Sequence, residues 1–394
     1  MFDLIVDNAR LYPMAGSAGR APARSFAVSQ GRIAGFDVAG AARQRIDAAD
    51  RVVLPGFIDC HTHALYAGDR LRERELRRGG ASYADIAAAG GGILSTVRAV
   101  RAASIEQLCA ATQPRLAALA REGVTTVEIK SGYGLDLKSE LKMLEAIERL
   151  RQQGPIDISA TCLAAHAVPP DSTRAAYVDF VLNQLLPAVH ERGLARMVDL
   201  YIEHLAFDLG DAERIFAAAR RLGFALHAHC EQLSNMHASA LAARSGARSV
   251  SHLEHLDEQG VLALAANGAV AVLLPGAFYC LNETNRPPIA GLRKARVAMA
   301  VATDLNPGTS PIASLLTCLH MSATIFGLTA DEALLAVTDH AARALGLEDR
   351  GRLAVGQRAD FCLWDLPEPA MLTYQLGGLL PARPTPTRSS RRGA

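Results

Sequence analysis

Residues 55–63 have the sequence PGFIDCHTH, a short apolar run that leads into an acidic residue and two histidines. On an extended strand, residues i and i+2 point to the same side, so His61 and His63 present two imidazoles in one direction. A pair of histidines in this spacing is a weak signal by itself. It becomes informative if other strands carry further metal-binding side chains to the same place.

After Gly56 the chain alternates short apolar segments with helical stretches rich in Ala and Leu. The β-branched run at 123–128 predicts a strand, and the apolar spacing within 139–153 predicts a helix that ends at Gly154. Eight strands are expected in all, and they end near His63, Lys130, His166, Glu203, His229, His252, Leu274 and Asp304. Eight strands with helices between most of them predict an α/β fold, a (β/α)8 TIM barrel.

The two ends of the chain predict a small β-sandwich-like layer beside this barrel. Short strands are expected within residues 1–55, and one strand at 360–364 is expected to join them. The barrel itself is predicted to span 56–345, with a final helix from Glu332 to about Leu345, and the C-terminal part of the layer to span 346–376. Residues 377–394 contain three prolines and an Arg-rich end, which predicts a disordered tail.

The composition narrows the possible partners. The formal net charge is +1, so no basic field indicates nucleic acid. Seven cysteines are scattered with no C-x-x-C pair, which is typical of reduced thiols in a cytoplasmic protein. The N-terminus lacks the features of a signal peptide, and no apolar run approaches a membrane span, so no membrane partner is expected.

Three further strand ends carry metal-binding side chains. His229 follows the fifth strand, His252 the sixth and Asp304 the eighth. The C-terminal ends of barrel strands meet at one mouth, and imidazoles with a carboxylate suit zinc or iron with a position left for water. His227 competes with His229 for the fifth-strand role, because the two residues share a face.

Several segments together resemble the amidohydrolase superfamily and, within it, the imidazolonepropionases. They cover almost the whole chain and lie at 59–64, 68–70, 87–96, 128–134, 165–169, 229–234, 273–279 and 302–309. The resemblance implies hydrolysis of the cyclic amide of 4-imidazolone-5-propanoate to N-formimino-L-glutamate, a step of histidine degradation. It also implies one divalent ion per chain, Zn²⁺ or iron, a small-molecule substrate and a homodimer.

The same resemblance assigns roles to individual residues. The metal ligands would be His61, His63, His229 and Asp304. His252 would lie beside the attacking water, and either His252 or Asp304 would act as the catalytic base. The substrate pocket would be lined by Arg70, Tyr133, His166, Gln232, Asn306, Gly308 and Thr309. Arg70 could hold the propionate through a planar fork that matches two carboxylate oxygens.

Some positions depart from the family pattern. Ser251 stands where an Asp is usual before the sixth-strand histidine, and this change could weaken the orientation of His252. Two-metal amidohydrolases resemble one another in a carbamylated lysine at the end of the fourth strand, which bridges the two ions. Here that strand ends with Glu203 and has no lysine, so the resemblance implies a site for one metal ion. Glu203 itself could support a ligand or serve only the fold. The three glycines at 90–92 lack the Lys-Ser/Thr of a phosphate loop and predict an ordinary loop near the mouth.

Two other functions are compatible with parts of this pattern. A deaminase of the same superfamily would share the metal site but differ in the pocket, where Arg70 and Tyr133 argue against it. A non-catalytic protein stabilised by a metal would have no use for His252 beside an open coordination position.

Overall fold

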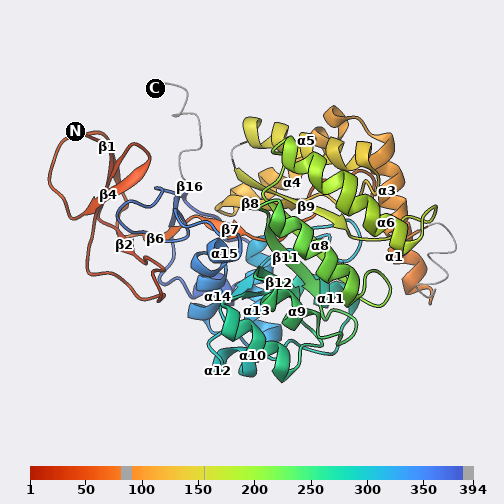
Figure 1. Cartoon of the computed structure of the whole chain (residues 1–394). Coiled ribbons are helices and arrows are strands. Elements are labelled where there is room, and N and C mark those ends of the chain that lie inside the picture. The colour runs from red at the N-terminus through yellow and green to blue at the C-terminus, as the bar shows by residue number, and fades with distance from the viewer. Residues whose placement is uncertain (81–90, 155, 385–394) are drawn as a thin grey trace.

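The computed structural model describes residues 1–80, 91–154 and 156–384 (Figure 1). Its largest sheet has eight strands, each parallel to its neighbours, in the order of the chain. They are β7 (Phe57–Asp59), β8 (Val124–Lys130), β9 (Asp157–Ala165), β10 (Met197–Ile202), β11 (Ala225–Cys230), β12 (Ala247–His252), β13 (Val270–Leu273) and β14 (Met299–Val301). The predicted eight-stranded barrel is confirmed.

The barrel closes where the segment after β7 meets the segment after β14. The Asp304 N–H donates to the His61 carbonyl over 3.0 Å, and the His63 N–H donates to the Leu305 carbonyl over 2.9 Å. An isolated bridge joins Thr62 to Leu305. Residues from the first and last strands of the barrel are therefore fixed against each other at this seam.

Helices cover the outside of the sheet (Figure 1). In chain order they are α1 (Leu71–Arg78), α3 (Ile93–Ala102), α4 (Ile105–Arg121), α5 (Leu137–Gln153), α6 (Arg174–Phe180), the π-helix η1 (Val181–Leu185), α7 (Leu186–Glu191), α8 (Leu209–Arg221), α9 (Ala238–Arg244), α10 (Glu258–Asn267), α11 (Pro275–Leu281), α12 (Ile289–Lys294), α13 (Leu315–Phe326), α14 (Ala330–Ala336), α15 (Asp339–Ala344) and α16 (Met371–Tyr374). The helix predicted at 139–153 begins two residues earlier, because the Asp136 side chain caps it by accepting from the Ser139 N–H.

The single helix predicted from Glu332 to Leu345 is wrong, since the structure has two helices, α14 and α15. They are separated at Thr338, whose φ of −130° and ψ of −98° are not helical. The Thr338 hydroxyl donates to the Leu334 carbonyl over 2.6 Å, a local bond that competes with helix continuation. The break frees the Val337 carbonyl to accept from the Ile58 N–H of β7 at 2.8 Å.

Two four-stranded sheets lie beside the barrel. One has the order β4-β3-β1-β5 and the other β16-β15-β6-β2. Their strands are β1 (Phe2–Asp7), β2 (Arg10–Leu11), β3 (Phe26–Ser29), β4 (Arg32–Phe36), β5 (Ala42–Asp47), β6 (Val52–Pro55), β15 (Phe361–Trp364) and β16 (Arg383–Pro384). The expected joining of the two chain ends is seen in β15, which pairs antiparallel with β6. Strands β2 and β5 were not predicted, because one is very short and the other is mostly polar.

The structure differs from the predicted disordered tail over residues 377–384. Strand β16 pairs with β15, and the Ala382 N–H donates to the Leu363 carbonyl over 2.8 Å. The rest of that predicted tail, 385–394, lies outside the described residues.

Two contacts fasten this β region to the barrel. The rings of Phe57 and Trp364 stack with centroids 5.5 Å apart. Asp157, the first residue of β9, accepts from both Arg350 and Arg358 over 2.6 Å. In the part of the chain that the structure describes, no helix combines the length and the apolar character needed to cross a bilayer.

Candidate metal centre

Nitrogen and oxygen donors from four strands gather at the C-terminal end of the barrel. His61, His229 and His252 form one group, and His61, His63 and Asp304 form another, in each of which the donor atoms lie within 4.8 Å of one another. All five side chains are buried. Of the two histidines that compete for the fifth-strand role, these groups contain His229 and not His227. Nδ1 of His227 instead lies 2.8 Å from the Ser249 hydroxyl.

The barrel seam sets the positions of three of these side chains. Asp304 has a φ of 50°, a turn that follows β14 and brings its carboxylate beside the first strand. Its Oδ1 lies 3.5 Å from Nε2 of His61 and 3.4 Å from Nε2 of His63. The Asn306 amide donates to the other carboxylate oxygen over 3.2 Å. One oxygen of Asp304 therefore faces two imidazole nitrogens.

A buried ion-pair network holds His229. Its Nδ1 lies 3.1 Å from Oδ1 of Asp199, and the other oxygen of Asp199 is 2.7 Å from Nζ of Lys130. Lys130 also pairs with Glu128 at 2.7 Å. Since Asp199 accepts from Nδ1, the Nε2 atom of His229 presents its lone pair toward the cluster, where it lies 3.4 Å from Nε2 of His63.

Lys130 is held as an ammonium by this network. Burial lowers the pKa of Lys130, but the carboxylates of Asp199 and Glu128 outweigh burial and raise the pKa above its usual value. A lysine in this state is a poor candidate for carbamylation. The expectation of a site for one metal ion therefore rests on both the missing fourth-strand lysine and the engaged Lys130.

Ser251 supports a different histidine from the one expected. Its hydroxyl lies 2.9 Å from Nδ1 of His61, not beside His252. Within residues 1–80, 91–154 and 156–384, Nδ1 of His252 has no hydrogen-bond partner. The His252 ring lies 5.4 Å from that of His229, with the centroids as reference points. His252 is thus buried at the cluster with a free ring nitrogen.

The donor set fits a metal ion. Among the described residues, Nε2 of His61 is buried without a hydrogen-bond partner, a costly arrangement unless a cation accepts its lone pair. Burial lowers the pKa of His61 and of His63 well below the usual value, so both imidazoles are neutral, the form that binds metals. Burial also lowers the pKa of His252 to about 3.

Arg70 lies at the same mouth, against the loop that follows β14. Its guanidinium contacts Gly308 so closely that an ideal Cβ at position 308 would overlap it. Its Nε donates to the Thr96 hydroxyl over 2.9 Å, which is the only hydrogen bond of this guanidinium among the described residues. Asn306 shapes the loop, because its side-chain oxygen accepts from the N–H groups of Gly308 and Thr309 at 2.8 Å and 2.7 Å.

Aromatic side chains line the other side of the cluster. The rings of His63 and His166 are stacked with centroids 5.2 Å apart, and Tyr133 lies 5.3 Å from His166. Nδ1 of His166 is 3.1 Å from the Gly132 carbonyl. Burial raises the pKa of Tyr133 above its usual value, so the phenol keeps its proton. Gln232 is buried on the loop after β11.

Two carboxylates shape the loop that carries Gln232. Glu203 accepts from the Leu233 N–H at 2.8 Å and from the Ser234 hydroxyl at 2.7 Å. Glu231 accepts from the Ala238 N–H at 2.6 Å. These contacts join Glu203 to the loop after β11 and not to a candidate metal ligand.

The predicted loop at 90–92 is described only in part. Gly92 precedes α3, and its N–H donates to the Glu73 carboxylate over 2.8 Å. Gly90 lies outside the described residues.

The sequence did not point to Asp199, Lys130 and Glu128 as support for the cluster. Asp199 is a lone carboxylate in the buried strand β10, and Glu128 and Lys130 occupy alternate positions of β8. Charged residues inside strands that are otherwise fully buried must be paired. This rule could have identified the three supporting residues from the sequence.

Residues 52–387 match the family model described as the Amidohydrolase family. The chain is 55% identical over 345 residues to an imidazolonepropionase of Erwinia tasmaniensis, which covers 87% of this chain and 85% of that protein. It is 53% identical over 334 residues to an imidazolonepropionase of Hahella chejuensis, with 84% of this chain and 83% of that protein covered.

Solved structures share the fold at much lower identity. An adenosine deaminase from Xanthomonas campestris with bound zinc superimposes with a TM-score of 0.70 at 19% identity, covering 95% of this chain and 90% of that one. A 5-methylcytosine deaminase from Klebsiella pneumoniae gives 0.73 at 19% identity, with coverage of 94% and 93%. These likenesses concern the fold. The family model and the curated relatives extend over most of the sequence, so the chain belongs to the amidohydrolase family and, within it, to the imidazolonepropionases.

Proposed function

We propose that this chain hydrolyses the ring amide of 4-imidazolone-5-propanoate and releases N-formimino-L-glutamate, a step of histidine degradation. Water adds to the ring carbonyl, the carbon–nitrogen bond breaks, and the ring nitrogen takes up a proton. The observation that carries the proposal is the position of Arg70 against Gly308, at the same mouth as the buried imidazoles and Asp304. The high identity to imidazolonepropionases supports it.

One divalent ion, zinc or iron, would be held by His61, His63, His229 and Asp304. When bound, such an ion supplies Lewis acidity that makes a water molecule more acidic and polarises a carbonyl. The chain contributes neutral imidazoles to that set, because burial lowers the pKa values of His61 and His63.

His252 and Asp304 are the two candidates for the group that accepts the proton of the attacking water. Both side chains are buried at the cluster. His252 has Nδ1 without a partner among the described residues, so this ring nitrogen is available for proton transfer. The same group could return the proton to the leaving ring nitrogen.

The propionate would be bound by Arg70. Nε of Arg70 is bonded to Thr96, which leaves the terminal nitrogens to form a two-point contact with a carboxylate. The remaining pocket residues would enclose the ring and fix its orientation, and they are Tyr133, His166, Gln232, Asn306, Gly308 and Thr309. Their stacking and hydrogen bonds place most of them before substrate arrives.

We also propose that the chain acts as a homodimer in the cytoplasm. The assembly and the compartment follow from the family resemblance and from the cysteine pattern. Light scattering of the purified protein tests the first, and a mass of one chain would contradict it.

The decisive experiment follows the ultraviolet absorbance of freshly generated imidazolonepropionate in the presence of the purified protein. Absorbance should be lost, the loss should stop when a chelator removes the metal, and it should return with zinc or iron. Released ammonia is measured in parallel, because a deaminase would produce it at this step and the proposed hydrolysis would not. A folded, metal-loaded protein that leaves the substrate unchanged would refute the proposal.

A further inference from the structure

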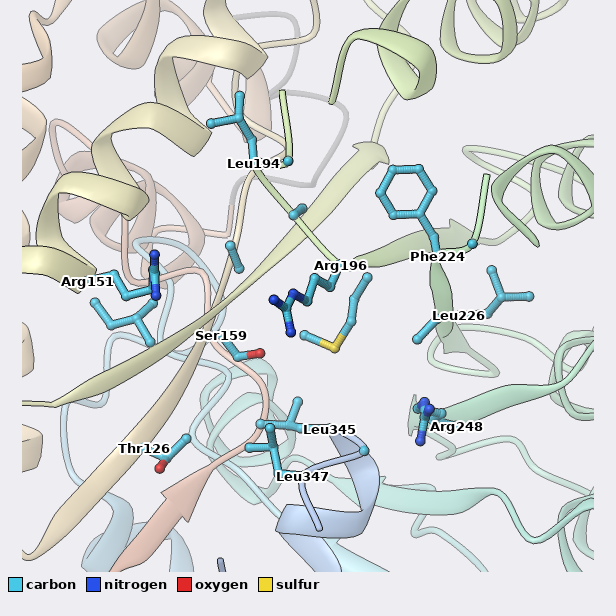
Figure 2. A pocket seen from close by; sticks show the side chains of 18 of the residues that line it. Thr126, Arg151, Ser159, Leu194, Arg196, Phe224, Leu226, Arg248, Leu345 and Leu347 are labelled. Atoms are coloured by element: carbon cyan, nitrogen blue, oxygen red, sulfur yellow. The ribbon is translucent and has the colours of Figure 1, made fainter. Parts of the chain in front are cut away.

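A second cavity lies at the opposite end of the barrel from the candidate metal centre. Its volume is about 810 Å³, within the range of cavities that bind small molecules. It is lined by the first residues of the central strands, including Asp157 of β9, Met197 of β10 and Ala225 of β11, whereas the metal centre lies at the C-terminal ends of the barrel strands. We call it the basal cavity (Figure 2).

The basal cavity concentrates positive charge. Its lining contains five arginines and two carboxylates, a net charge of +3, in a chain whose formal net charge is +1. The charged residues of the lining are Arg151, Arg196, Arg220, Arg248, Arg350, Glu148 and Asp157. Like charges gathered in a concave site attract anions, because low-dielectric walls focus the field.

The two carboxylates are already paired. Glu148 binds Arg151 over 2.6 Å, and Asp157 binds Arg350 over 2.6 Å. Arg196, Arg220 and Arg248 take part in no ion pair with any described residue. The excess charge therefore belongs to these three side chains.

A position at the end of a helix explains only one of these three arginines. Arg220 lies in the last turn of α8, where a cation is favourable beside the negative end of the helix dipole. Arg196 and Arg248 gain nothing from a helix end in this way, since Arg196 directly precedes β10 and Arg248 is the second residue of β12.

The side chain of Arg248 is packed against the backbone of the chain. Its guanidinium lies across Gly346, after α15, where an ideal Cβ would overlap it. Figure 2 shows Arg196 near the middle of the view and Arg248 to its right, and both line the cavity together with Ser159. Two guanidinium forks that face one space can each bind a carboxylate or phosphate group through two hydrogen bonds.

We propose that the basal cavity binds a small polyvalent oxyanion with carboxylate or phosphate groups, held by Arg196 and Arg248. The two arginines come from the starts of different strands, so an anion with one charged group would engage only one of them well. The site is separate from the catalytic mouth, and the proposal does not depend on the proposed activity.

Isothermal titration with succinate and tricarballylate, which chelate zinc and iron only weakly, tests the proposal, with acetate as the monovalent comparison and ionic strength fixed with chloride. The folded chain should bind one succinate or tricarballylate more tightly than acetate. The double variant Arg196→Ala/Arg248→Ala should bind at least tenfold more weakly. Arg20→Ala/Arg43→Ala, which removes the same charge from the N-terminal β region, should bind like the unchanged chain.

Two more variants test the geometry and the location of this site. Arg196→Lys/Arg248→Lys keeps the charge but loses the forks, and it should weaken binding less than the alanine pair while leaving the fold intact. Arg70→Ala should leave binding unchanged. If Arg70→Ala abolished binding, the anion would lie at the catalytic mouth. If tricarballylate bound no better than acetate, the arginines would attract anions only through their general charge. Either result would overturn the proposal.

Discussion

His252 is the histidine of the cluster whose removal should separate catalysis from metal binding. Its ring lies beside His229, and its Nδ1 has no partner among the described residues. His252→Asn should reduce kcat by about 10² to 10⁴, the usual contribution of a positioned acid–base group, while the protein keeps its metal. Steady-state turnover and metal content by atomic emission measure the two effects.

His255→Asn is the matched control, because His255 lies three residues beyond His252, the last residue of β12, but contacts Asn285 and not the cluster. It should leave turnover unchanged. A His252→Asn protein that kept full turnover would exclude His252 as the base and leave Asp304.

Asp199 should influence the metal through His229. It accepts from Nδ1 of His229 and is paired with Lys130. Asp199→Asn removes the charge that makes His229 a stronger donor and leaves Lys130 with one carboxylate fewer, so metal affinity should fall by about 10- to 100-fold. Competition with a coloured chelator measures the affinity, and the exposed Asp171→Asn is the control. An unchanged affinity in Asp199→Asn would show that this network serves the fold alone.

At the scale of elements, the loop after β14 links the proposed substrate pocket to the candidate metal centre. Gly308→Ala would push a Cβ into the Arg70 guanidinium. Substrate binding should weaken, with KM raised about tenfold or more and kcat changed much less, because the displaced group is the one proposed to contact the propionate and not the reacting carbonyl. Kinetics of Gly308→Ala beside the exposed Gly210→Ala test this, and an equal loss of kcat would contradict it.

Helices and strands were predicted correctly where a single physical rule determines the secondary structure. The barrel strands follow from runs of buried apolar residues, and their order follows from the chain because parallel neighbours are joined by helices. The break between α14 and α15 was missed, because it depends on the bond between Val337 and the distant Ile58. Strand β5 was missed because its residues Ala42, Arg43 and Gln44 show no apolar alternation.

The candidate site could be located from strand ends, but its supporting contacts could not. His61, His63 and His229 are brought together as expected from their places at strand ends. The partner of each second ring nitrogen depends on side-chain direction across neighbouring strands. For this reason the sequence alone could not pair Ser251 with His61 or Asp199 with His229.

At the scale of the whole molecule, Asp157 should make stability depend on acid. Burial raises the pKa of Asp157, but its bonds to Arg350 and Arg358 outweigh burial and lower the pKa from 3.8 to about 2. A lowered folded-state pKa stabilises the protein above pH 3.8, and this contribution is lost as the pH falls from 3.8 to about 2. It is worth about 2 kcal/mol at neutral pH.

Asp157→Asn should therefore lower the free energy of unfolding at pH 7, and should flatten the acid limb of the stability curve. Urea unfolding at a series of pH values measures both. Asp208→Asn, which replaces a half-exposed carboxylate paired with Arg174, is the comparison. If the free energy of unfolding fell equally steeply with acid in Asp157→Asn and in the unchanged chain, the arginines would not lower the pKa of Asp157 in the folded state.

The seam of the barrel has a consequence for how the protein is made. His61 and His63 leave the ribosome early, yet the carboxylate that faces them belongs to Asp304, and the backbone bonds that align the two segments also need Leu305. A growing chain cannot assemble the full donor set until the eighth strand has been synthesised. Completion of the proposed donor set is thus a late event in biogenesis, and a prematurely terminated chain would lack its carboxylate.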